Sequence, residues 1–137
     1  MLVVDDAPAI VKMTSLMLKK MGHKVSSAEN GLMAVEAVVE QWQQRREKFD
    51  LILMDLQMPV MDGLESMKRI RMFEEEQAAA EWLEPAYGHQ LIIGLSANSD
   101  SDAMESALEC GADAFLSKPF TVDAFRKTLQ KIMLNRD

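Results

Sequence analysis

The chain has 137 residues, 48% of them hydrophobic and 27% charged, which favours one globular domain over residues 1–137. Its apolar runs are too short to span a bilayer, no signal peptide is evident, and one cysteine excludes an internal disulfide. A net charge of −7 disfavours non-specific binding to nucleic acid or to an anionic membrane. We therefore expect a cytoplasmic domain that contacts neither, with the parent protein free to carry a membrane anchor.

Short apolar runs alternate along the chain with amphipathic stretches of helical period. The apolar runs predict strands at Leu2–Val4, Lys24–Ser27, Leu51–Met54, Leu91–Leu95 and Ala114–Ser117. The other stretches predict helices at Pro8–Met21, at Leu32–Lys48, from Gly63 to beyond Arg71, at Ser101–Cys110, and after an N-cap at Thr121. This alternation predicts an α/β fold, a doubly wound parallel sheet of five strands with five helices on its two faces.

Polar side chains follow the ends of four of these predicted strands. Asp5 and Asp6 follow the first strand, and Asp55 follows the third. Ser96 follows the fourth strand and Lys118 the fifth. Because the carboxyl ends of parallel strands meet at one edge of a sheet, we expect these residues to converge there. Three converging carboxylates repel one another unless one is protonated or a cation joins them, and Mg²⁺ is the cation that suits such a site best.

Four segments of the chain resemble the receiver domain of two-component response regulators, the CheY-like family. They are "LVVDDAP", "LILMDLQMPVMDG", "IIGLSAN" and "GADAFLSKPF", in this order along the sequence. The resemblance covers essentially the whole chain and is strongest to receivers from hybrid histidine kinases and phosphorelays. It implies a flavodoxin-like fold with the strand order 2-1-3-4-5.

The resemblance also implies how a phosphoryl group would be handled. Asp55 would accept it from a phosphohistidine, and Lys118 would pair with the phosphoryl oxygens. Ser96 would hydrogen-bond the group once it is attached to Asp55. Phe115 would then turn inward, which would reshape the face formed by the fourth helix, the fifth strand and the fifth helix.

The resemblance further implies a set of Mg²⁺ ligands. Asp6 would bind the ion directly and Asp5 mostly through water, together with Asp55 and the backbone carbonyl of Gln57. The domain would not be an enzyme in its own right, because it would catalyse only its own phosphorylation and dephosphorylation. The phosphodonor would be a histidine kinase or a histidine-containing phosphotransfer protein.

The same resemblance gives roles to Pro119, to Asn98 and again to Gln57, whereas the residue types of Pro59 and Gly63 indicate structural roles. The peptide bond before Pro119 would be cis, whereas Pro59 and Gly63 would shape a rigid turn and the start of the next helix. Gln57 and Asn98 flank the site and would tune the lifetime of the phosphoryl group.

Three competing interpretations fit this sequence less well. A pseudo-receiver would keep the fold as a protein-interaction module without being phosphorylated. A phosphatase of the haloacid dehalogenase type would need an aspartate where this chain has Gln57, and a flavin carrier would have its phosphate repelled by Asp5 and Asp6. Only Met1–Val4 precede the aspartate pair, so we expect the first strand to be truncated.

Overall fold

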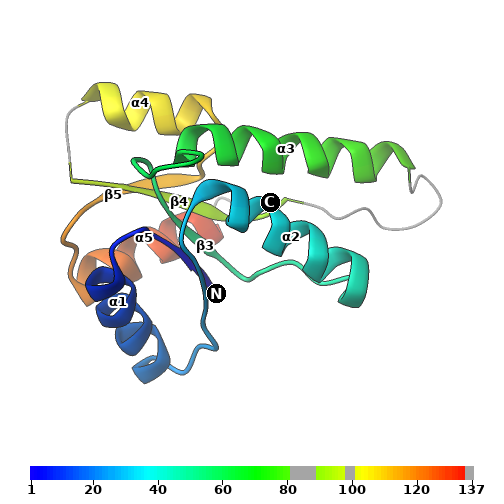
Figure 1. Ribbon diagram of the computed structural model, residues 1–137. Coiled ribbons are helices and arrows are strands. Elements are labelled where there is room, and N and C mark those ends of the chain that lie inside the picture. Colours follow the sequence, from blue (N-terminus) through cyan, green and yellow to red (C-terminus); the bar gives the residue numbers. More distant parts are fainter. Residues whose placement is uncertain (81–88, 98–100, 135–137) are drawn as a thin grey trace.

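The computed structural model describes residues 1–80, 89–97 and 101–134. Five parallel strands form one sheet in the order β2-β1-β3-β4-β5. Figure 1 labels three of them, β3, β4 and β5. The strands are β1 (Leu2–Val4), β2 (Ser26–Ala28), β3 (Ile52–Asp55), β4 (Ile92–Ser96) and β5 (Ala114–Ser117). The helices are α1 (Pro8–Lys20), α2 (Gly31–Arg45), α3 (Gly63–Ala80), α4 (Ser101–Glu109) and α5 (Val122–Leu134). The predicted doubly wound α/β fold and its strand order are confirmed.

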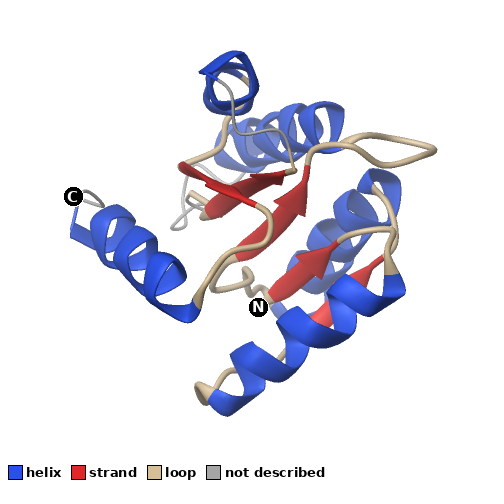
Figure 2. Cartoon of the chain, turned by 90° about the vertical axis from the view of Figure 1, so that its left-hand side faces the viewer, coloured by secondary structure: helices blue, strands red, loops and turns tan. Residues whose placement is uncertain are grey.

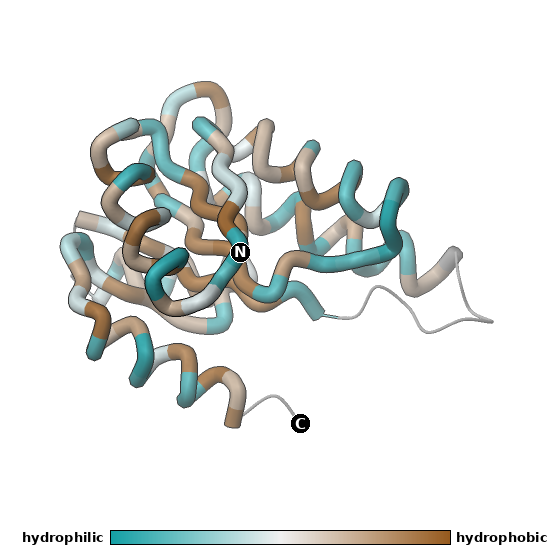
Figure 3. Tube along the Cα trace, turned by 90° about the horizontal axis from the view of Figure 1, so that it is seen from below, coloured by the Kyte–Doolittle hydropathy of each residue, from teal (hydrophilic) through white to brown (hydrophobic). Residues whose placement is uncertain are grey.

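Two hydrophobic cores lie on opposite faces of the sheet, and helices cover both (Figure 2). Alternate strand residues divide between them, so Ile52 and Met54 pack under α2, α3 and α4, whereas Leu53 packs under α1 and α5. Every residue of β1, β3 and β4 is buried, which explains why these strands read as continuous apolar runs. Figure 3 shows hydrophobic residues along the interior segments and hydrophilic residues recurring along the helices.

Two predicted boundaries miss by two or three residues, and several others miss by one. The second strand begins at Ser26 instead of Lys24, because β1 offers it partners only over Ser26–Ala28 and Ser26 is an exposed edge residue. The second helix ends at Arg45 instead of Lys48, because Arg46 adopts a left-handed conformation with φ of 54° and its N–H donates to the carbonyl of Trp42. No glycine marks this helix end, so the sequence carried no local stop signal.

A shift of one residue in two strands affects the site directly. β3 ends at Asp55 and β4 ends at Ser96, so both residues are the last of their strands and not the first of the following loops. The backbone of Asp55 is therefore held by pairing with β4, and that of Ser96 by pairing with β5. Among the residues that the structure describes, none of the helices has the length and apolar character needed to cross a bilayer.

Candidate functional site

Three carboxylates meet at the carboxyl ends of β1 and β3. One carboxylate oxygen from each of Asp5, Asp6 and Asp55 lies within 4.8 Å of the other two. Asp5 and Asp55 are buried, whereas Asp6 is exposed. The predicted convergence of these side chains is therefore present in the fold.

A single lysine side chain bridges the two buried carboxylates. Nζ of Lys118, which follows β5, lies 3.2 Å from Oδ2 of Asp5 and 3.2 Å from Oδ2 of Asp55. One ammonium cannot balance three carboxylates, so the cluster keeps a negative excess when all are ionised. Hard oxygen donors with excess negative charge, one of them open to solvent, form a set that fits Mg²⁺.

Backbone N–H groups orient the two buried carboxylates. Oδ1 of Asp5 accepts a hydrogen bond of 2.9 Å from the N–H of Ala7, and Oδ1 of Asp55 accepts one of 3.2 Å from the N–H of Gln57. Each bond is a local turn in which an aspartate binds the backbone two residues later. In both residues Oδ1 is engaged by the backbone, and Oδ2 is the atom that faces Lys118.

Burial and neighbouring charges shift the pKa values of Asp55 and Lys118. Desolvation raises the pKa of Asp55 above its ordinary value, and the charge of Asp5 adds to this effect. The N–H of Gln57 and the ammonium of Lys118 oppose the rise but do not cancel it. Burial lowers the pKa of Lys118, yet Asp55 and Asp5 together raise it by more, so Lys118 remains a cation at neutral pH.

The predicted switch residues lie on the two neighbouring strands. Ser96 is buried at the end of β4, and its backbone carbonyl accepts a hydrogen bond of 2.8 Å from the N–H of Lys118. Ser96 and Gln57 also line a cavity of about 340 Å³, together with residues of the loop after β3 and of α4. Phe115 is half-buried against the core under α2, α3 and α4. Asn98 lies outside the described residues.

The start of α3 packs directly against the end of β3. A Cβ atom added to Gly63 would lie 2.2 Å from the backbone oxygen of Asp55, so no larger residue fits without moving this backbone. Pro59 is exposed in the intervening loop, and the Lys118–Pro119 peptide bond is cis. The cis bond is the one predicted before Pro119, and Gly63 is the first residue of α3.

One positioning residue escaped the sequence analysis. Oδ1 of Asp62 accepts a hydrogen bond of 2.9 Å from the N–H of Glu65 and so caps α3. The signal was present, because an aspartate three residues before a glutamate is typical of a helix start. By fixing this helix end, Asp62 also fixes Gly63 against Asp55.

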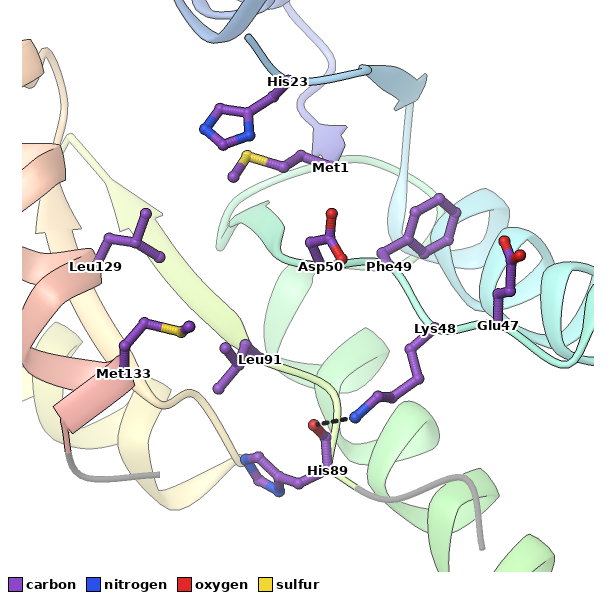
Figure 4. A pocket seen from close by; sticks show the side chains of 10 residues that line it. All are labelled: Met1, His23, Glu47, Lys48, Phe49, Asp50, His89, Leu91, Leu129 and Met133. Atoms are coloured by element: carbon purple, nitrogen blue, oxygen red, sulfur yellow. Dashed lines mark hydrogen bonds between the residues drawn. The ribbon is translucent and has the colours of Figure 1, made fainter. Parts of the chain in front are cut away.

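A second cavity lies at the opposite edge of the sheet, where the strands begin (Figure 4). It has a volume of about 500 Å³ and contains none of the predicted site residues. It is lined by Met1, His23, Glu47, Lys48, Phe49, Asp50, His89, Leu91, Leu129 and Met133. The cluster of Asp5, Asp6 and Asp55 and its partner Lys118 lie instead at the carboxyl edge.

Comparison with known proteins agrees with this geometry. A family model described as the response regulator receiver domain matches residues 1–130. Hybrid signal transduction histidine kinase E of Dictyostelium discoideum is 35% identical over 130 residues, which cover 95% of this chain. The chain spans only 7% of that relative's length.

Two solved structures are similar in fold and in sequence. The receiver domain of the histidine kinase CKI1 from Arabidopsis thaliana, complexed with Mg²⁺ and BeF₃⁻, is 32% identical with a TM-score of 0.82. The match covers 96% of this chain and 87% of that one. The co-crystal of the Saccharomyces cerevisiae phosphotransfer protein Ypd1 with the receiver domain of Ssk1 matches at 30% identity and a TM-score of 0.76, over 92% and 82% of the two chains. The chain therefore belongs to the response regulator receiver domain family.

Proposed function

We propose that this receiver domain accepts a phosphoryl group on Asp55 in a two-component phosphorelay and uses Mg²⁺ to do so. The observation that carries the proposal is the cluster at the carboxyl edge. In it, Asp55 ends a buried strand, two further carboxylates lie within 4.8 Å, and Lys118 lies 3.2 Å away. A buried nucleophile with a cation beside it and a metal-binding set around it suits phosphoryl transfer.

The chemistry follows from the positions of these side chains. An oxygen of the Asp55 carboxylate attacks the phosphorus, and the P–N bond of the donor phosphohistidine breaks as the new P–O bond forms. The bonding electron pair leaves with the imidazole nitrogen of the donor. Lys118 offsets the negative charge of the phosphoryl oxygens, and Asp55 keeps its orientation through the N–H of Gln57.

The metal would be held by Asp6 directly, by Asp5 mostly through water, by Asp55, and by the backbone carbonyl of Gln57. Mg²⁺ in this position supplies positive charge against the transferring group. The exposed Asp6 leaves the metal side of the site open, whereas Asp5 is committed to Ala7 and Lys118. This division supports Asp6 as the direct ligand.

Phosphorylation would be read out at the neighbouring strands. Ser96 would hydrogen-bond the phosphoryl group, and Phe115 would turn inward, so that the face of α4, β5 and α5 changes shape. Gln57 and Asn98 are polar amides that would orient a hydrolytic water. We therefore expect self-dephosphorylation that is measurable in Mg²⁺, and a modified form stable for many hours would contradict this expectation.

The donor would be a histidine kinase or a histidine-containing phosphotransfer protein. The Ypd1–Ssk1 complex supports a phosphotransfer protein, since it pairs one with a receiver of the same fold. The relatives are hybrid kinases many times longer than this chain, which supports a place in such a protein. The domain itself would catalyse only its own phosphorylation and dephosphorylation.

The test is labelling with acetyl phosphate, with and without Mg²⁺, followed by intact mass measurement. Wild type should gain one phosphoryl group only with Mg²⁺, and Asp55→Asn should gain none. Asp62→Asn is the matched control, because it removes a nearby exposed charge but keeps the side-chain oxygen that caps α3, so this variant should still be labelled. A folded wild type that binds Mg²⁺ but gains no mass would favour the pseudo-receiver.

A further inference from the structure

An ionic network lies at the amino edge of the sheet, at the opposite end of β4 from Ser96. We call it the amino-edge clamp and define it as the side chains of Arg71 and Glu74 from α3, Gln90 before β4, and Asp113 before β5. The clamp plays no part in the proposed phosphoryl chemistry. Its position relative to α4 nevertheless bears on how that helix can move.

Arg71 ties α3 to the turn that connects α4 with β5. Its guanidinium donates to the backbone carbonyl of Gly111 from Nε at 3.0 Å and from Nη2 at 2.6 Å. It also pairs with the carboxylates of Glu74 at 2.9 Å and Asp113 at 3.2 Å. The three charged side chains are 11–20% exposed, so these charge-assisted bonds are shielded from water.

Asp113 locks the same turn to the first residue of β4. Its Oδ2 accepts a hydrogen bond of 2.9 Å from the N–H of Ile92, and its own N–H donates to the carbonyl of Ile92 at 2.8 Å. Its Oδ1 contacts Nε2 of His89. The turn after α4 is therefore bound to both α3 and β4 by several independent bonds.

Gln90 extends the clamp to the loop before β3. It is completely buried, and its amide nitrogen donates to the carbonyl of Phe49 at 2.7 Å while its amide oxygen accepts from the N–H of the same residue. Lys48 adds a bond of 3.3 Å to the carbonyl of His89, drawn as a dashed line in Figure 4. The clamp thus joins four segments that are distant in sequence.

Most residues of α4 are exposed to solvent. Over its nine residues, Ala107 is the one that is buried, and Met104 and Leu108 are exposed. Ala107 faces β4 beside Gly94, where an added Cβ would lie 3.3 Å from the Cβ of Ala107. A helix with one buried residue and a firmly bonded carboxyl end can tilt about that end more readily than it can shift as a whole.

We propose that the amino-edge clamp is a fixed pivot for the phosphorylation switch. The inference rests on the proposed function. Modification of Asp55 loosens or displaces the first turns of α4 and the side chain of Phe115, whereas the turn at Gly111–Asp113 stays in place. The switch signal is thereby confined to the half of α4 nearest the phosphoryl group.

Amide hydrogen exchange measured by NMR tests this pivot on the intact wild-type chain. Mg²⁺ with beryllofluoride serves as the probe, with beryllofluoride standing in for the phosphoryl group. Exchange at Glu105 and Ser106 should change about tenfold or more, and exchange at Gly111–Asp113 less than about twofold. Equal changes in both places, or no change in either, would overturn the pivot.

Asp113→Asn provides the second arm of the experiment. The asparagine keeps an oxygen for the N–H of Ile92 but removes the charge that pairs with Arg71. In this variant the turn amides should also respond to beryllofluoride, by about tenfold. Asp123→Asn is the matched control, because it breaks an exposed ion pair with Lys127 and should behave as wild type.

The outcomes distinguish the pivot from a purely structural clamp and from the proposed function. A purely structural clamp would lower the stability of Asp113→Asn without extending the beryllofluoride response into the turn, and that result would overturn the pivot. Acetyl phosphate labelling of the same samples reports the proposed function independently. Failure of wild type to gain a phosphoryl group would overturn the proposed function and the pivot with it, whereas labelling with a responsive wild-type turn would overturn the pivot alone.

Discussion

At the scale of single residues, the site is a compromise between reactivity and stability. Asp55 is buried where its carboxylate is disfavoured, and Lys118 offsets part of that penalty. Lys118 also forms an ion pair with Asp5, so one ammonium group bridges two buried carboxylates. Removing the charge of Lys118 or of Asp55 should therefore change stability as well as chemistry, and the two changes in stability should have opposite signs.

Removal of the lysine charge should be costly to the metal-free protein. Lys118→Met leaves two buried carboxylates facing each other, which we expect to lower the free energy of unfolding by about 3 kcal/mol. Urea denaturation in the presence of a chelator measures this change, and excess Mg²⁺ should recover part of it. Lys127→Met is the control, since its ion pair is 76% exposed on the lysine side and its loss should cost less than about 0.5 kcal/mol. A small loss in both variants would contradict the role given to Lys118.

Removal of the aspartate charge should have the opposite effect, with a definite pH dependence. Native Asp55 holds its proton more tightly than the unfolded chain does, so the free energy of unfolding falls as pH rises from its ordinary pKa of 3.8 through the raised value. Asp55→Asn should accordingly be more stable than wild type at neutral pH in a chelator. The difference should shrink as pH falls to 3.8 and below, where wild-type Asp55 becomes protonated in both states. Urea midpoints at several pH values test this, and a constant difference would contradict it.

At the scale of elements, most of the fold was readable from the sequence, and the failures have physical causes. The buried strands were predicted because β1, β3 and β4 are covered on both faces and so are apolar up to their last residues, which in β3 and β4 are Asp55 and Ser96. The edge strand β2 was misplaced because Ser26 and Ser27 are exposed and polar, and only pairing with β1 defines them as a strand.

The candidate site was predictable for a related reason. Its side chains end strands or follow them directly, so position in the chain and parallel topology together bring Asp5, Asp55 and Lys118 to one edge. The amino-edge clamp was not predictable in this way. Arg71 lies within a helix, and its partners Gly111 and Asp113 are about forty residues away, so only the packed structure joins them.

The junction between β3 and α3 gives a prediction at the element scale. Gly63→Ala would place a Cβ against the backbone of Asp55 and Leu56, which must move to make room. We expect a loss of about 2 kcal/mol in the free energy of unfolding, together with slower labelling by acetyl phosphate because Asp55 is displaced. Met72→Ala, on the exposed side of the same helix, should cost less than about 0.5 kcal/mol and leave labelling unchanged. Labelling at the wild-type rate in Gly63→Ala would show that this packing does not position Asp55.

At the scale of the whole molecule, the carboxylate cluster is tied to global stability. Asp5 follows β1 and Asp55 ends β3, and these adjacent central strands contribute residues to both hydrophobic cores. Repulsion within the cluster therefore acts on the centre of the sheet. A cation that binds only the folded chain should stabilise the entire domain and not merely the loops around it.

Titration with Mg²⁺ under urea denaturation should reveal this coupling. The unfolding midpoint of wild type should rise with Mg²⁺ concentration, by about 2.7 kcal/mol in unfolding free energy when the free ion reaches about a hundred times its dissociation constant. Asp6→Asn should bind Mg²⁺ more weakly and show a smaller rise, while its stability in a chelator should stay close to that of wild type, because Asp6 is exposed. Asp5→Asn, by contrast, changes a buried residue bonded to Ala7 and Lys118, so its stability should change even without metal. Equal Mg²⁺ responses in wild type and both variants would show that the ion binds elsewhere.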